Sequence, residues 1–198
     1  MAVLPGEEYD PRRALRAARR RRPDPVWGAP WAFAIREAQP QDVPHIRAIY
    51  NHYVLNSTVT FDEAPLSHQA MRAKLNRVQQ AGYPWIVAVS ERGEILGYAN
   101  VAAYRDKAAY RFTVEDSIYL GPAATGKGVG RALLGELIAR SKAAGLKEIV
   151  AVIADRGAEA SIALHEALGF TEVGRMGRVG FKFDRWLGTV TLQRSLRH

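Results

Sequence analysis

The segment of residues 116–131 restricts the fold more than any other part of the sequence. An apolar strand pattern runs into a loop with Gly126, Gly128 and Gly130 at alternate positions, and an amphipathic helix pattern begins directly after it. Glycines leave the backbone N–H groups of the loop uncovered, and the first turn of a helix adds unpaired N–H donors and a partial positive charge. The segment therefore predicts an anion-binding loop between a strand and a helix, and a diphosphate group suits it. Taken alone, the pattern also fits a plain glycine-rich turn.

The spacing of these glycines argues against two other phosphate-binding loops. The nucleoside triphosphatase loop, G-x-x-x-x-G-K-S/T, places its lysine after the last glycine, whereas Lys127 lies between two glycines. The dinucleotide-binding pattern G-x-G-x-x-G is not met either, and the segment lies mid-chain after several predicted strands. We therefore assign the loop to neither class.

Strand and helix patterns alternate along the rest of the chain. The expected elements are a strand at 34–38, a helix from Val43 that Asp42 caps, a helix from Ser67 or His68 to Gln80, strands at 85–90, 95–103 and 113–120, a helix at 129–144, a strand at 148–154, a helix at 158–168 and two final strands. The order leaves room for one more strand before Thr113. Strands in the majority with two late crossover helices predict a mixed α/β (α+β) domain around one sheet.

Composition narrows the class of protein. The chain has 198 residues, 47% of them hydrophobic, and no cysteine, which excludes disulfides, thiolate metal sites and a cysteine nucleophile. We expect no metal, because no histidine and carboxylate cluster has ligand spacing. No apolar run approaches the ~20 residues of a membrane span, and no targeting segment is evident, so a cytoplasmic protein without a membrane partner is expected.

Residues 1–30 differ in composition from the rest. They hold five prolines and, between positions 12 and 22, seven arginines without an acid, which account for much of the net charge of +8. This composition predicts a flexible Arg/Pro-rich extension before a domain at 31–198, because it disfavours a packed core. A short helix there would bring like charges together three and four residues apart.

Motifs across residues 34–196 resemble those of the GNAT superfamily of N-acetyltransferases. The superfamily's pyrophosphate loop, Q/R-x-x-G-x-G/A, corresponds to Thr125-Gly-Lys-Gly-Val-Gly130. Further motifs are similar to the phosphinothricin/methionine sulfoximine acetyltransferase branch: Asn51-His-Tyr53, Ser57-Thr-Val-Thr-Phe61, Tyr83-Pro-Trp85, Ala109-Tyr-Arg-Phe-Thr-Val-Glu115, Leu164-His-Glu-Ala-Leu-Gly-Phe170 and Gly180-Phe-Lys-Phe-Asp-Arg-Trp-Leu187.

The resemblance implies a fold, a reaction and a cosubstrate. The fold would be a central mixed, mostly antiparallel sheet with helices on both faces. The reaction would be acetyl transfer from acetyl-CoA to the amine of a small amino acid or analogue, such as phosphinothricin, methionine sulfoximine or methionine sulfone, as in herbicide or antibiotic resistance. It would proceed by direct attack, in a homodimer. The implied acetyl-CoA-binding residues are Ile118, Tyr119, Leu120, Thr125, Gly126, Lys127, Gly128, Val129, Gly130 and Arg131.

Glu115 lies where the family places its general base. An ammonium cannot attack a thioester, so a base must remove a proton, and a partly desolvated carboxylate at a strand end has its pKa raised for that task. Without the T-V-E motif, Glu115 would be interpreted as an ordinary surface carboxylate. The implied partner is His165, where many members have a tyrosine that protonates the leaving thiolate; it also fits a hydrogen-bonded histidine on a packed helix.

The remaining implied residues would bind the acceptor. Its carboxylate needs a cation, ideally a planar guanidinium, and Arg105 and Lys107 lie in the loop before Tyr110. As single residues, loop cations are often merely solvated, and Tyr110 and Phe61 also fit core aromatics. Val114 and Asp116, which flank Glu115, complete the expected acceptor site.

Three positions depart from the family pattern. Thr125 replaces the Gln or Arg that begins the loop, Ala158 stands where many relatives have an Asn that binds the CoA arm, and Gly188 stands where a relative commonly has Asp. These departures bear on CoA affinity and substrate identity more than on the fold.

Two other functions compete with this interpretation. A different amine, such as a polyamine, an antibiotic or a protein N-terminus, is one alternative, but a site for a cationic polyamine would place acids rather than Arg105 near Glu115. The other is a CoA-sensing module whose arginine-rich extension docks nucleic acid or an anionic membrane. Glu115 and the intact glycine-rich loop disfavour it, so nucleic acid is not the expected partner.

Overall fold

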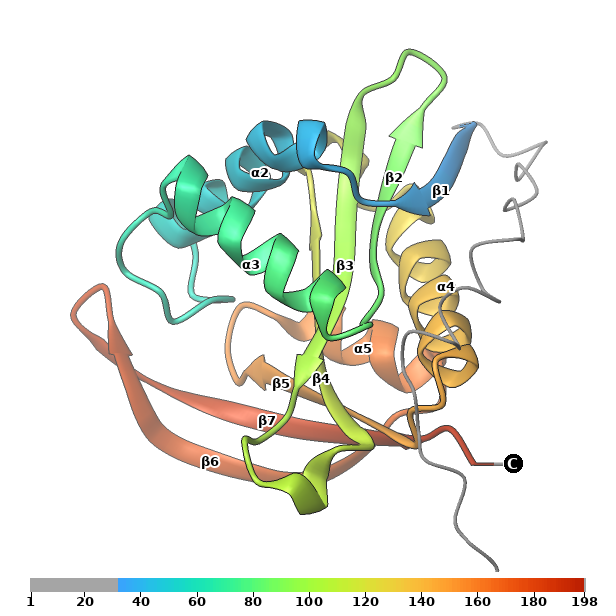
Figure 1. Ribbon diagram of the computed structural model, residues 1–198. Helices are drawn as coiled ribbons and strands as arrows, with labels where there is room; N and C mark the ends of the chain where they lie inside the picture. The colour runs from blue at the N-terminus through green and yellow to red at the C-terminus, as the bar shows by residue number, and fades with distance from the viewer. Residues whose placement is uncertain (1–31, 198) are drawn as a thin grey trace, which may run out of the picture.

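The computed structural model describes residues 32–197 (Figure 1). The arginine-rich extension predicted for residues 1–30 lies outside the described residues.

The described chain contains seven strands and four α-helices. In chain order they are β1 (Phe33–Glu37), α2 (Val43–Asn56), α3 (His68–Gln80), β2 (Trp85–Ser90), β3 (Ile95–Ala103), β4 (Thr113–Leu120), α4 (Val129–Ala143), β5 (Glu148–Ala154), α5 (Glu159–Ala167), β6 (Thr171–Lys182) and β7 (Arg185–Ser195). The predicted bounds are confirmed to within about one residue. The room left for an additional strand before Thr113 is taken by a short 3-10 turn, Ala108–Tyr110.

All seven strands form one sheet in the order β1-β2-β3-β4-β5-β7-β6. Every neighbouring pair is antiparallel except β4 and β5, which are parallel. This parallel pair is short, because only Thr113–Glu115 pairs with Glu148–Val150 before the two strands diverge. Within residues 32–197, the rest of β4 has no strand partner on the β5 side, whereas β5 continues along β7.

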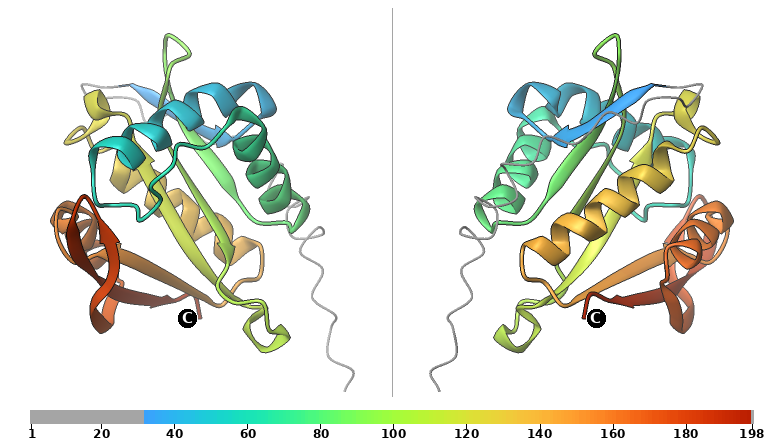
Figure 2. Two further views of the ribbon diagram at one scale, coloured as in Figure 1. Left: turned by 90° about the vertical axis from the view of Figure 1, so that its left-hand side faces the viewer. Right: turned by 90° about the vertical axis from the view of Figure 1, so that its right-hand side faces the viewer.

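Helices cover both faces of the sheet (Figure 2). Helix α2 turns a stripe of apolar side chains with a 3.6-residue period toward the sheet and packs there with α3. Helix α4 buries a second stripe, including Leu133, Leu134 and Leu137, against the opposite face, where α5 also packs. Each fully buried Leu or Ile contributes about 1.5–3 kcal/mol to folding. The predicted mixed, mostly antiparallel sheet between two helical layers is confirmed.

The two helices on the first face of the sheet are capped differently. The Ser67 hydroxyl accepts a hydrogen bond from the Ala70 N–H at 3.1 Å and caps α3. Asp42 is the N-cap residue of α2 as predicted, but its side chain makes no capping hydrogen bond to that helix, because its carboxylate belongs to the preceding 3-10 turn. It accepts from the Gln39 N–H at 2.8 Å and from both terminal nitrogens of Arg36 at 2.6 and 2.8 Å.

The C-terminal hairpin of β6 and β7 forms one edge of the sheet (Figure 1). Phe183 and Asp184 connect the two strands with positive φ angles of 50° and 56°. Several large apolar side chains of this hairpin are exposed: Val173, Met176, Val179, Phe181, Phe183 and Trp186. Across residues 32–197, no helix has the length and apolar character needed to cross a membrane.

Candidate active site

A cavity of about 760 Å³ opens where β4 and β5 diverge. It begins at the N-terminus of α4 and follows β4 from Leu120 back to Glu115. Residues Val59, Thr60 and Phe61 of the loop between α2 and α3 form a further part of its wall, and α5 contributes another. The cavity therefore joins the glycine-rich loop to the predicted base.

One end of the cavity is made of main chain. Gly126 and Gly128 have φ angles of +70° and +81°, a conformation that L-residues rarely adopt, and a Cβ at either position would meet no atom within 4 Å. Gly130 is needed for packing instead, because its Cβ would lie 3.3 Å from the Leu120 side chain and 3.4 Å from that of Leu164.

Helix α4 begins in this loop. Its N-cap residue, Gly128, makes no side-chain hydrogen bond to the first turn of the helix. First-turn N–H groups without a cap attract an anion, which the helix dipole also favours. Thr125 and Arg131 line the same end of the cavity. Of the remaining predicted loop residues, Val129 is buried in the core, and neither Val129 nor Lys127 belongs to the cavity wall.

The open side of β4 forms the middle of the cavity. The predicted residues Ile118, Tyr119 and Leu120 all line it. The Tyr53 hydroxyl donates to the Leu120 carbonyl oxygen at 2.7 Å and so ties helix α2 to this strand. An exposed strand edge pairs readily with an extended chain that carries amide groups.

Glu115 lies at the inner end of this strand edge and is half-buried. Burial raises the pKa of its carboxyl group, and the negative charge of Asp116 raises it further. The positive charges of Arg105 and Lys74 act in the opposite direction, but the net direction is upward. A carboxylate with a raised pKa beside a cavity is suited to accept a proton.

Asp116 and His165 form a buried pair across the cavity floor. The Asp116 Oδ2 and His165 Nε2 atoms are 3.0 Å apart, and both side chains are only 2% exposed. Burial lowers the pKa of His165, but the hydrogen bond and charge of Asp116 and the Ser161 carbonyl outweigh it, so the net direction is upward. A proton on His165 is therefore stabilised by the neighbouring Asp116 carboxylate.

The hydrogen bonds of His165 occupy both ring nitrogens. Nδ1 lies 2.7 Å from the Ser161 carbonyl oxygen, to which it must donate, and Nε2 contacts Asp116. The ring also packs edge-on against Phe170, with centroids 4.9 Å apart. In this arrangement the imidazole has no free nitrogen for a ligand, whereas the buried Oδ1 of Asp116 has no partner among residues 32–197.

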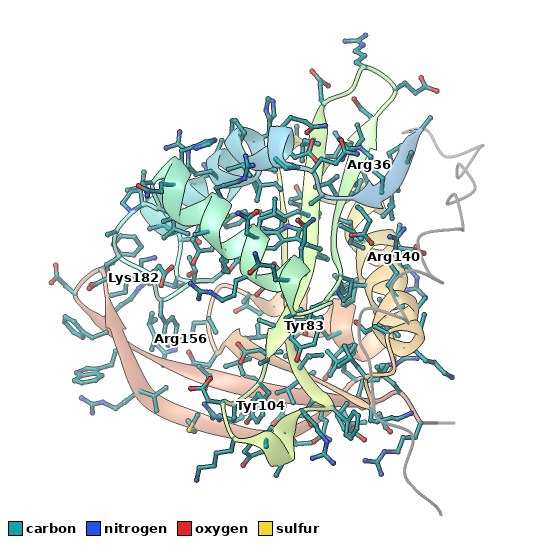
Figure 3. All side chains as sticks on the ribbon, in the orientation of Figure 1. Arg36, Tyr83, Tyr104, Arg140, Arg156 and Lys182 are labelled. Carbon is teal, nitrogen blue, oxygen red and sulfur yellow. The ribbon has the colours of Figure 1, made fainter. Side chains whose placement is uncertain are left out.

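The predicted acceptor residues are only partly brought together. Phe61 and Asp116 line the cavity with Glu115. Arg105 lies over the Tyr104 ring at 4.7 Å and reaches Glu115 only through its charge, and Tyr110 packs edge-on against the same ring. Figure 3 shows Tyr104 in the lower part of the view, where the chain leaves β3 for the loop that leads to β4.

Two predicted acceptor residues lie away from the cavity. Lys107 is exposed and does not belong to its wall. Val114 is fully buried in the core beneath α4 and so has no surface that an acceptor could contact.

Two positions that depart from the family pattern, Ala158 and Gly188, can be placed in the structure. Ala158 lines the cavity as the N-cap residue of α5, where it supplies no capping side chain. At Gly188, a Cβ would lie 2.4 Å from the Met176 carbonyl oxygen and 2.6 Å from the Asp155 carboxylate. The Gly188 N–H donates to Asp155 at 2.9 Å. Asp155 therefore occupies the space that a side chain at position 188 would need.

Sequence reasoning missed several residues of the site. Tyr53 and Thr60 were quoted only as parts of motifs, yet both line the cavity. Lys74 was missed entirely; its ammonium lies 5.3 Å from the centre of the Tyr50 ring and acts electrostatically on Glu115. A single lysine on a polar helix carries no local signal, because its proximity to Glu115 depends on how α3 packs.

Comparisons with known proteins agree with this geometry. The model of the acetyltransferase (GNAT) family matches residues 46–170. Phosphinothricin N-acetyltransferase of Alcaligenes faecalis is 46% identical over 165 residues, which are 83% of this chain and 83% of that protein. L-methionine sulfoximine/L-methionine sulfone acetyltransferase of Pseudomonas paraeruginosa is 42% identical over 163 residues, 82% of this chain and 94% of that protein.

A solved structure is similar over the same extent. The crystal structure of a GNAT superfamily phosphinothricin acetyltransferase from Sinorhizobium meliloti, in complex with acetyl-CoA, has a TM-score of 0.79 and 47% sequence identity, covering 82% of this chain and 88% of that one. The segment that the family model matches includes Glu115, the glycine-rich loop and His165. With the sheet, the divergent strands and the uncapped helix in agreement, the chain belongs to the GNAT family of acetyltransferases.

Proposed function

We propose that the protein transfers an acetyl group from acetyl-CoA to the amine of a small amino acid of the phosphinothricin or methionine sulfoximine type. The observation that carries the proposal is the position of Glu115, a half-buried carboxylate of raised pKa at the inner end of a cavity that starts at an anion-binding loop. The names of the two curated relatives support the acceptor class.

The residues present fit acetyl-CoA. Gly126 and Gly128 expose the main chain of the loop, and the uncapped start of α4 would bind the pyrophosphate. The open edge of β4 at residues 118–120 would pair with the amide-bearing arm, and its N–H groups would stabilise an oxyanion on the thioester carbonyl. The Sinorhizobium meliloti structure, which is in complex with acetyl-CoA, supports this assignment.

Glu115 would act as the general base. Its raised pKa brings the carboxylate closer to the acidity of the ammonium that it must deprotonate. The free amine would then attack the thioester carbonyl directly, and the tetrahedral intermediate would lose its N–H proton and break its C–S bond to give the amide and the thiolate of CoA, which solvent protonates. A cysteine acyl-enzyme is excluded because the chain has no cysteine.

His165 would act as a positioning residue rather than as the acid that protonates the leaving thiolate. Both of its ring nitrogens already hold protein partners, Asp116 and the Ser161 carbonyl. The pair would keep the Asp116 charge fixed beside Glu115, where it raises the pKa of the base.

Arg105 would attract the acceptor carboxylate through its charge, and Tyr110, which packs on the same Tyr104 ring as Arg105, would help to hold that loop in place. Arg105 and Lys74 place two positive charges near Glu115. This arrangement suits an anionic amino acid and would repel a polyamine.

We also propose that the protein is a cytoplasmic homodimer. The exposed apolar side chains of the β6–β7 hairpin, such as Phe181 and Trp186, form a surface that water disfavours. A second copy of the chain would cover it.

The test is acetyl-CoA-dependent thiol release with phosphinothricin, methionine sulfoximine, methionine sulfone, spermidine and a short peptide as acceptors. We expect release with the three amino acids and about a 10²-fold or greater loss of kcat in Glu115→Gln, with acetyl-CoA binding retained. Thermal unfolding of the variant serves as a folding control. Preferential acetylation of spermidine or the peptide would reject the acceptor class, and full activity of Glu115→Gln would reject the base.

A further inference from the structure

The loop between α2 and α3 forms one wall of the cavity without regular secondary structure of its own. Val59, Thr60 and Phe61 supply that wall. In both Figure 1 and the left view of Figure 2, the loop passes close to the tip of the β6–β7 hairpin. We call residues 58–62 the acceptor wall, since the charges of Asp62 and Glu115 act on the same two groups, Lys74 and Tyr119.

Helix α2 and the loop before α5 hold the acceptor wall from one side. The Tyr50 hydroxyl contacts the Thr60 hydroxyl at 3.2 Å and donates to the Asp62 carboxylate. The Thr58 hydroxyl donates to the Arg156 carbonyl oxygen at 3.2 Å. These contacts leave the Thr60 carbonyl to another partner.

That partner is Lys182, the last residue of β6. Its side chain is buried, with only 2% of the residue exposed, and its Nζ donates to the Thr60 carbonyl oxygen at 2.8 Å across 122 positions of sequence. Figure 3 shows Lys182 where the hairpin tip approaches the loop. Burying an ammonium is costly. Here the cost is partly offset by the carbonyl, by the Phe183 ring at 5.0 Å, and by the charges of Asp62 and Glu63, although burial still lowers the pKa of Lys182.

A second contact between the hairpin and the acceptor wall requires a glycine. A Cβ at Gly180 would lie 2.4 and 2.5 Å from two ring carbons of Phe61. The φ angle of Gly180 is outside the left-handed region, so the backbone conformation alone does not demand glycine. The ring of Phe61, which lines the cavity, therefore packs directly on the backbone of β6.

We propose that Lys182 and Gly180 are positioning residues that hold the acceptor wall in place and so determine affinity for the acceptor amino acid. This inference rests on the proposed function. The hairpin tip touches the wall through the Thr60 carbonyl and the Phe61 ring, and the glycine-rich loop at the other end of the cavity has no part in these contacts. Loss of either contact changes the acceptor end and leaves the acetyl-CoA end intact.

The first variant is Lys182→Met, which keeps an apolar stem of similar length and removes the ammonium. We expect the KM for the acceptor to rise about tenfold or more with a smaller change in kcat, since a displaced wall misplaces the bound acceptor. The KM for acetyl-CoA should stay within about twofold. The matched control is Arg175→Met, which removes an exposed cation from the same strand and should change neither constant.

A double-mutant cycle tests Gly180 against Phe61. Gly180→Ala should raise the acceptor KM in the wild-type background, because the methyl group displaces the ring. In the Phe61→Ala background, which lacks the ring, the same substitution should have almost no effect. Equal effects of Gly180→Ala in both backgrounds would overturn the assignment.

Hydrogen exchange without substrates separates this inference from the proposed function. In Lys182→Met, amides of residues 57–66 should exchange faster, while those of residues 126–131 keep their wild-type rates. Faster exchange confined to 57–66 supports the positioning role even if the wild type acetylates no amino acid, in which case the proposed function fails by itself. Unchanged exchange at 57–66, or a parallel rise of both KM values in Lys182→Met, would overturn the positioning role.

Discussion

The two ends of the cavity are built from different parts of the polypeptide. The end that we propose binds acetyl-CoA, the acetyl-CoA end, uses consecutive residues, and the groups that it offers are main-chain N–H donors that Gly126 and Gly128 leave uncovered. The acceptor end uses side chains from several elements, including Glu115 and Asp116 on β4 and His165 on α5. One end is thus a local conformation, and the other is a product of tertiary packing.

This difference determines which physical forces each end depends on. A main-chain site requires particular φ angles and open space, so glycine replacement is its weak point. The acceptor end holds buried ionisable groups whose charges interact, so its function is coupled to stability and to pH. Substitutions at the two ends should therefore differ in what they change: the KM for acetyl-CoA at one end, and stability and pH dependence at the other.

The largest effect is expected at the acceptor end. Asp116→Ala should lower the free energy of unfolding by about 3 kcal/mol at pH 6, because it leaves His165 buried without its partner. Asp116→Asn, which keeps an oxygen acceptor, should lose about 1 kcal/mol. Urea denaturation followed by circular dichroism measures both. Glu172→Gln removes only an exposed ion pair and should leave the unfolding curve in place.

The free energy of unfolding that the Asp116 variants lose should depend on pH. The pKa of His165 in the folded protein is raised above its ordinary value of 6.5, so the pair's contribution is fully present below pH 6.5 and is lost as the pH rises through the raised value. The gap between wild type and Asp116→Asn should therefore be wider at pH 6 than at pH 8.5. A wider gap at pH 8.5 would contradict the charged pair.

The next effect belongs to the acetyl-CoA end. Gly128→Ala places a Cβ at a φ angle of +81° and should raise the KM for acetyl-CoA about tenfold, because the loop must leave the conformation that exposes its N–H groups. The acceptor KM should change little. Gly135→Ala is the matched control within α4: its Cβ would meet no atom within 4 Å, so stability should rise by about 1 kcal/mol with both KM values unchanged.

Much of the fold could be predicted from the sequence because its signals are local. The apolar period of α2, the end of α3 and the glycine-rich loop each depend on residues within about one turn of one another. The anion-binding character of the loop was predicted from the same kind of signal, whereas the resemblance implied the individual acetyl-CoA-binding residues. Of those ten, Lys127 and Val129 lie outside the cavity wall.

The acceptor end was less predictable because it depends on long-range contacts. Asp116 contacts His165, 49 positions away in the sequence, and Lys182 contacts Thr60, 122 positions away. No local sequence pattern predicts either contact. Strand alternation does explain Val114: neighbouring residues of a strand point to opposite faces, so Val114 faces the core beneath α4 while Glu115 points away from it.

The smallest effect is a shift of the pH profile that should appear at one end alone. Lys74 lowers the pKa of Glu115 through its charge, so Lys74→Met should move the acidic limb of kcat/KM for the acceptor to higher pH and leave the plateau within about twofold. Arg77→Met, an exposed cation of the same helix that does not act on Glu115, should leave the limb in place. Salt at about 0.5 M should narrow the difference between Lys74→Met and wild type, because screening weakens the charge that the variant lacks.

The KM for acetyl-CoA should not change with pH across the same limb, since the glycine-rich loop binds through main-chain N–H groups that do not titrate. If that KM follows the acidic limb as well, the two ends share a titrating group, and their separation into a main-chain site and a charged side-chain site is wrong.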